Sequence, residues 1–121
     1  MNAIQEIKET YTLEDFKEIA NHGCQSGVCS QHIYYGDTIE FFTKYPDEIT
    51  SFIKDNLGIE AIEAVIGDSD GDYNQWMNDM TWMFIELVAM QVVDDYEDAV
   101  SDLGDGYNPS RSMTESRYAQ V

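Results

Sequence analysis

Apolar residues recur every three or four positions along most of this chain, which is the period of an amphipathic helix. In the first such segment they stand at Leu13, Phe16, Ile19 and Ala20. Thr12 and Asp15 have the spacing of a capping box, and Gly23 can end a helix in the left-handed conformation. The pattern therefore predicts a helix between Thr12 and Gly23.

The middle of the chain repeats this arrangement. Asp37, with Glu40 three residues later, marks a second helix start. The apolar positions that follow are Ile39, Phe41, Phe42 and Tyr45. Pro46 ends that segment and fits the first turn of a third helix, which Gly58 closes. The apolar stripe of the third helix is Ile49, Phe52, Ile53 and Leu57.

Residues 59–66 fit either a short helix or a buried strand, and Ala61 and Ala64 favour the helix. The last helix is expected to be the longest, with Asp72 or Asn74 at its start and Gly104 at its end. Its apolar positions are Trp76, Met80, Met83, Phe84, Leu87, Val88, Met90, Val92, Val93, Tyr96, Ala99, Val100 and Leu103. A helix of roughly 30 residues would be about 45 Å long.

The chain therefore predicts an all-α protein. Its 121 residues are a common size for one domain, and no repeat or linker divides them. We expect a compact helical domain over residues 1–104, with an irregular insert around residues 21–36. Residues 105–121 lack periodicity and carry Pro109 and several serines, so they are expected to form a flexible tail.

The net negative charge of the chain limits the kinds of partner that it can bind. The chain has 24 acidic residues against six Lys and Arg, a net charge of −18, and 14 of the acids lie between Lys54 and Arg111, where no Lys or Arg occurs. Such a charge opposes compaction and repels nucleic acid and anionic membranes, so a basic protein is the natural partner. We find no secretory signal and no apolar run long enough to span a bilayer, so a cytoplasmic location is expected.

The acidic end of the long helix is the first candidate site. Asp94, Asp98, Asp102 and Asp105 fall on one helical stripe, about 5–6 Å apart along the axis, close to the spacing of phosphates on one nucleic-acid strand. Asp95 and Glu97 widen this patch. Acids at a helix C-terminus oppose the macrodipole by about 0.3–1 kcal/mol each, which stability alone would not favour. A solvated face is the alternative, and the absence of basic partners favours a binding surface.

A second acidic group is formed by Asp68, Asp70, Asp72 and Asp79. Its alternating acids resemble a calcium loop, but Tyr73 stands where that loop requires glycine, and Asp79 replaces the bidentate glutamate. A turn with a helix cap, which adds to the anionic surface, fits better.

A third candidate combines His22, Cys24, Cys29 and His32 within one short segment. These residues could hold zinc, although structural zinc sites usually draw their ligand pairs from separate elements. Reduced, partly buried thiols are the favoured interpretation, because no signal peptide indicates an oxidising compartment. A Cys–His nucleophile would need a spatially adjacent base that sequence proximity does not supply, so no catalytic residue and no cofactor is predicted.

The run from Ala20 to Gly27, that from Ile33 to Phe42, and the triplet Asp47-Glu48-Ile49 together resemble a family of small uncharacterised phage and prophage proteins. In that family's pattern, apolar or small residues stand where Cys29 and His32 occur here, which weakens the zinc interpretation. The resemblance implies a phage context and no activity. In character the chain is also similar to acidic antirestriction and anti-CRISPR proteins that imitate DNA.

The sequence therefore predicts a non-enzymatic, phage-encoded inhibitor acting in the cytoplasm of an infected bacterium. It would bind a basic nucleic-acid-binding protein of a CRISPR–Cas or restriction system through its acidic residues and block DNA binding, with a homodimer left open. The alternative is a zinc-binding interaction module built on the Cys/His segment, in which the acids serve only solubility.

Overall fold

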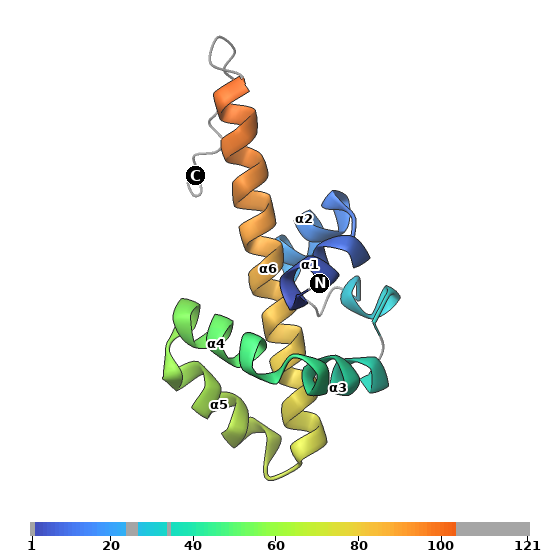
Figure 1. Cartoon of the computed structure of the whole chain (residues 1–121), viewed down its shortest axis with the longest axis vertical. Coiled ribbons are helices and arrows are strands. Elements are labelled where there is room, and N and C mark those ends of the chain that lie inside the picture. Colours follow the sequence, from blue (N-terminus) through green and yellow to red (C-terminus); the bar gives the residue numbers. More distant parts are fainter. Residues whose placement is uncertain (1, 24–26, 34, 104–121) are drawn as a thin grey trace.

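The computed structural model describes residues 2–23, 27–33 and 35–103, with the side chains of residue 35 and of residues 101–103 left out. Within these ranges there is no strand. The chain forms six α-helices and one short 3₁₀ helix (Figure 1), namely α1 (Ala3–Thr10), α2 (Leu13–His22), η2 (Cys29–Gln31), α3 (Tyr35–Lys44), α4 (Pro46–Leu57), α5 (Ile59–Ser69) and α6 (Tyr73–Leu103). The all-α fold class is confirmed.

Helix α6 is the axis around which the other helices gather (Figure 1). Helices α3, α4 and α5 pack against its first half, while α2 and, less extensively, α1 pack against its middle. With 31 residues, α6 is far longer than α4, which has 12. At 1.5 Å per residue the two lengths are about 46 Å and about 18 Å, so the C-terminal half of α6 projects beyond its neighbours.

The core lies where these helices meet α6. Phe84 is fully buried, and its ring lies 5.2 Å from that of Phe52 on α4 and 6.2 Å from that of Phe41 on α3. The other fully buried large apolar residues are Ile7, Ile19, Ile49, Ile53, Met80, Ile85 and Val88. Every α-helix except α5 contributes one of these side chains or one of the Phe84 ring contacts, so a single core joins the helices.

The predicted helix ends are largely confirmed. Thr12 and Asp15 form the expected capping box of α2, Gly23 follows it with φ 72°, and Pro46 lies in the first turn of α4. Asp72 caps α6 by accepting a hydrogen bond of 3.2 Å from the Gln75 amide. Residues 59–66 are helical, as favoured, within the longer α5.

The structure differs from the sequence prediction at two helix starts. Helix α3 begins at Tyr35, two residues before the expected start at Asp37. Helix α1 was not predicted, because its eight residues carry only a short apolar face. Its start is capped by Asn2 and Gln5 and also by Glu48 of α4, whose carboxylate accepts hydrogen bonds from the amides of Ala3 (2.9 Å) and Ile4 (3.3 Å). A cap from a residue so distant in sequence has no local signal.

The insert between α2 and α3 is fixed to the rest of the fold in its described part. Tyr11, at the C-cap of α1, donates a hydrogen bond of 2.7 Å from its hydroxyl to the carbonyl of Cys29 in η2. Burial is the main cause that raises the pKa of Tyr11, with the Asp15 carboxylate contributing, so this hydroxyl stays protonated and remains a donor. The predicted tail, residues 105–121, lies outside the described residues.

Candidate acidic binding surface

The acidic group that comprises Asp68, Asp70, Asp72 and Asp79 in the sequence begins at the turn between α5 and α6. Asp68, Asp70 and Asp72 are exposed, and Asp70 adopts the left-handed conformation with φ 53° at the end of α5. Across the described part of the chain, no three His, Cys, Asp or Glu side chains are arranged to hold a metal ion. The segment forms a turn at Asp70 and a helix cap at Asp72, as the sequence favoured.

Asp79 belongs to this group in sequence but differs from it in environment. Its carboxylate is partly buried and accepts hydrogen bonds from Gln75 Nε2 (2.8 Å) and Asn78 Nδ2 (3.4 Å). Because these side-chain amides already occupy the carboxylate, Asp79 is less available to a partner than the exposed acids at the turn.

The acidic end of the long helix lies on the projecting half of α6. We call its described members the acidic stripe: Asp94, Asp95, Glu97 and Asp98. All four are exposed. None of them takes part in the four ion pairs found among the described residues. Asp102 is within α6, but its side chain is not described, and Asp105 lies outside the described residues.

The two acidic groups do not form one patch. Asp72 stands just before the first turn of α6, and Asp94 lies 22 residues further along it, which corresponds to about 33 Å of helix. Figure 1 shows how far apart the beginning of α6 and its projecting half lie. The structure therefore separates residues that the sequence had assigned to one binding surface.

The apolar face of α6 continues past the point where other helices cover it. Val88 and Ala89 are fully buried, Val92 and Val93 are partly buried, and beyond them Tyr96 is 42% exposed and Val100 is 39% exposed. This exposure follows from how far the shorter helices reach along α6, which tertiary packing decides. Tyr96 and Val100 are therefore surface residues that the sequence analysis had assigned to the apolar face alone.

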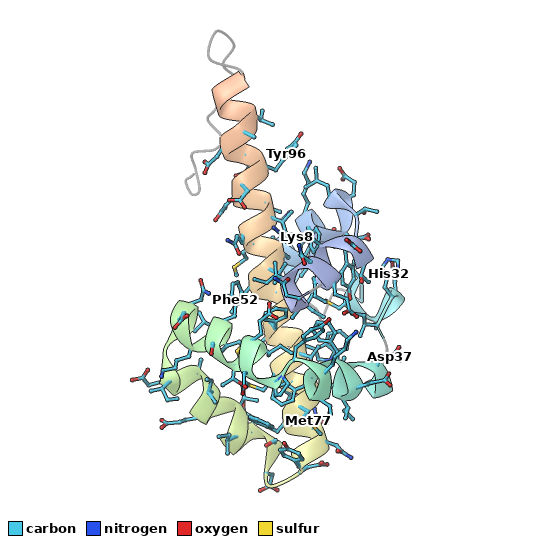
Figure 2. The ribbon with its side chains drawn as sticks, in the orientation of Figure 1. Lys8, His32, Asp37, Phe52, Met77 and Tyr96 are labelled. Carbon is cyan, nitrogen blue, oxygen red and sulfur yellow. The ribbon has the colours of Figure 1, made fainter. Side chains whose placement is uncertain are left out.

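One cation lies near this end of α6. Lys17 Nζ of α2 is 5.0 Å from the centroid of the Tyr96 ring, and it also lies 3.6 Å from Glu14 Oε2. Figure 2 shows Tyr96 on the projecting part of α6, close to the α1–α2 pair. Lys17 thus brings α2 into contact with the projecting part of α6.

The described part of the Cys/His segment differs from the sequence expectation at Cys29. Cys29 is 1% exposed and disulfide-bonded, so the favoured expectation of a reduced thiol is wrong at this residue, and a thiolate ligand for zinc is absent there. Cys24 lies outside the described residues. His22 pairs with Glu18 of its own helix at 3.8 Å, and His32 pairs with Asp15 at 3.3 Å.

The titratable groups with shifted pKa values take part in a helix cap or in contacts between helices. The pKa of Asp15 is lowered, mainly by the hydrogen bond from the Thr12 amide and to a lesser degree by His32. The pKa of Lys44 is raised by its hydrogen bond to Glu6, and the same carboxylate accepts a 2.8 Å hydrogen bond from the Tyr45 hydroxyl, whose pKa is also raised. The Asp15 shift thus reports a helix cap, and the Lys44 and Tyr45 shifts report a contact between α1 and the end of α3.

The fold and the surface define a small, strongly acidic, all-α protein organised on one long projecting helix. Its family model matches residues 1–98, so the chain belongs to the family described as Domain of unknown function (DUF7222). That match contains α1 to α5 and ends at the last residue of the acidic stripe. No curated protein and no solved structure matches the chain significantly. Among the described helices, none has both the length and the apolar character to cross a bilayer.

Proposed function

We propose that this protein is a non-enzymatic inhibitor that binds a basic, nucleic-acid-binding protein and occupies the surface that normally holds phosphates. The observation that carries the proposal is the acidic stripe, with four exposed carboxylates on a helix segment that projects from the domain. A protruding segment can enter a groove that a flat surface would not reach. The partner we expect is a protein of a bacterial CRISPR–Cas or restriction system, as the acidic character of the chain suggests.

The charge density of the stripe supports this proposal. Four carboxylates fall within five residues, which is about 6 Å of helix, or about one charge every 1.5 Å. Double-stranded DNA carries one charge about every 1.7 Å. Lysine and arginine side chains spaced to contact phosphates would therefore meet a comparable density of negative charge on α6.

The arrangement is unfavourable for the helix itself, which also supports a role in binding. Asp94 and Asp98 are four residues apart, where like charges repel by about 0.2–0.5 kcal/mol. No basic residue occurs in the last turn of α6. A basic partner would relieve this repulsion, and electrostatic steering would speed association in a way that weakens as salt increases.

The proposal is tested by capturing partners from bacterial lysate with the tagged protein at low salt and at about 0.5 M salt. We expect a nucleic-acid-binding complex that high salt releases and that its own DNA or RNA displaces. The variant Asp94→Asn/Asp98→Asn should lose most of this capture. The matched control Glu40→Gln/Asp55→Asn removes two exposed acids elsewhere and should capture as the wild type does. Equal capture by both variants would refute the proposal.

A further inference from the structure

The projecting half of α6 presents two faces of different chemistry. At 100° per residue, Tyr96 and Val100 continue the buried face of Ile85, Val88 and Ala89, whereas Asp94 and Asp98 lie on the opposite side. Asp95 and Glu97 flank the apolar residues on either side. An exposed apolar strip bordered by carboxylates therefore extends the line of the core beyond the helices that cover it.

We infer that this apolar strip, together with its acidic borders, docks a basic amphipathic helix of the partner. The inference rests on the proposed function in taking the partner to be basic, and it adds the kind of element that the partner supplies. Such a helix would place its apolar face on Tyr96 and Val100 and its lysines or arginines beside Asp95 and Glu97. It would continue the packing that α2 begins against α6.

The negative charge of α6 favours a basic helix of the partner over a second copy of the chain as the occupant of the strip. Helix α6 contains no Lys, Arg or His, so two copies packed through this strip would bring acidic borders against acidic borders. The chain carries a net charge of −18, which further opposes self-association. An anionic membrane surface is repelled for the same reason. A basic helix matches both the apolar strip and its borders.

The geometry of Lys17 supports this choice. Its ammonium group already lies 5.0 Å from the Tyr96 ring, so a cation is accommodated on this aromatic side chain within the chain itself. Helix α2 thus shows, at the edge of the strip, the combination of apolar packing and positive charge that we assign to the partner.

The test uses a synthetic peptide of three heptads, with leucine at the a and d positions and lysine elsewhere, and a scrambled peptide of the same composition. Binding to the full chain is measured by fluorescence anisotropy at low and high salt. We expect the amphipathic peptide to bind at least about tenfold more tightly than the scrambled one, because only the former aligns its apolar residues with the strip.

Two protein variants separate this inference from the proposed function. Tyr96→Ser/Val100→Ser should weaken binding of the amphipathic peptide by about tenfold at either salt concentration, with helix content unchanged by circular dichroism. The control Leu57→Ser/Ile66→Ser removes two residues that are 49% and 53% exposed on α4 and α5, and should bind as the wild type does. Asp94→Asn/Asp98→Asn changes carboxylates on the opposite side of α6 from the strip, so it should leave binding of the amphipathic peptide close to that of the wild type and lower only the long-range, salt-dependent part.

If Tyr96→Ser/Val100→Ser binds as the wild type does and the Asp variant does not, the strip is not a docking surface while the acidic stripe remains one. Equal binding of the two peptides would also overturn the inference. A wild-type dimer in sedimentation velocity that Tyr96→Ser/Val100→Ser converts to a monomer would assign the strip to a second copy instead. Loss of capture from lysate in the Asp variant tests the proposed function independently of these results.

Discussion

Thr38 of α3 donates a hydrogen bond of 2.6 Å from its hydroxyl to Asn78 Oδ1 of α6, inside the core. Thr38 is fully buried and Asn78 is 6% exposed. The Thr81 hydroxyl in turn donates to the carbonyl of Thr38 at 3.0 Å. Helices α3 and α6 are therefore joined by polar as well as apolar contacts, and this fixes their register because each buried polar group needs its partner.

Replacing Thr38 by valine keeps the side-chain shape and removes the donor to Asn78. The buried amide oxygen is then left without this partner, so we expect the free energy of unfolding to fall by about 1–3 kcal/mol. Urea denaturation measures the change. Thr43→Val is the matched control on the same helix, because Thr43 is exposed, and it should shift stability by no more than about 0.5 kcal/mol. Equal effects of the two substitutions would contradict the role of the buried pair.

Glu48 ties the start of α1 to α4, so its removal should loosen α1 specifically. We expect Glu48→Ala to lower the free energy of unfolding by about 0.5–2 kcal/mol, the usual range for a lost helix cap. Hydrogen exchange of the Ala3 and Ile4 amides, which donate to Glu48, should accelerate more than that of α3 amides. Asp47→Asn, at the neighbouring exposed position, should leave the exchange of those two amides unchanged.

The Asp15 carboxylate should contribute to the acid limit of stability. Its pKa is lowered in the folded state, first by the Thr12 amide, so its contribution is present above the unfolded pKa of about 3.9 and is lost as the pH falls through the folded value. We expect the stability of Asp15→Asn to fall less steeply than that of the wild type below about pH 4. Denaturation midpoints measured from pH 2 to pH 7 test this, and parallel curves would contradict it.

The contact between Lys17 and Tyr96 should stabilise the first turns of the projecting segment of α6. Lys17→Met keeps an unbranched side chain and removes the cation, so the loss should be about 0.5–1 kcal/mol, the range for an exposed cation–π pair. Hydrogen exchange should increase in α6 beyond Val93 while the buried part of the helix stays protected. Lys54→Met, the control at an exposed position of α4, should leave exchange in α6 unchanged.

Most of the fold could be predicted because its helices carry their own end signals. Asp72, Pro46 and Gly58 act on neighbouring residues only, so their effect can be deduced from local sequence. Helix α1 could not be found in this way, because its cap from Glu48 and its burial depend on segments distant in the chain. The disulfide state of Cys29 was missed for a different reason, because the sequence analysis inferred a reducing compartment from the lack of a signal peptide.

The candidate site was predictable in part for the same reason. The exposure of Asp94 and Asp98 follows from helical periodicity, since they stand opposite the apolar face. Their separation from the acids at the α5–α6 turn, and the exposure of Tyr96 and Val100, depend on how far the shorter helices reach along α6. That reach is a property of tertiary packing and is not encoded in any local pattern.

In the sequence, α6 comes after all the helices that pack against it, and this order affects how the chain folds during synthesis. Helices α1 to α5 leave the ribosome before the helix that supplies Phe84, Met80 and Val88 to their common core. Until then their apolar faces have no permanent cover, so the nascent chain must remain open or be shielded by a chaperone. Folding should therefore be completed in one late cooperative step, and a ribosome stalled before α6 has emerged should display a chain that proteases cleave readily.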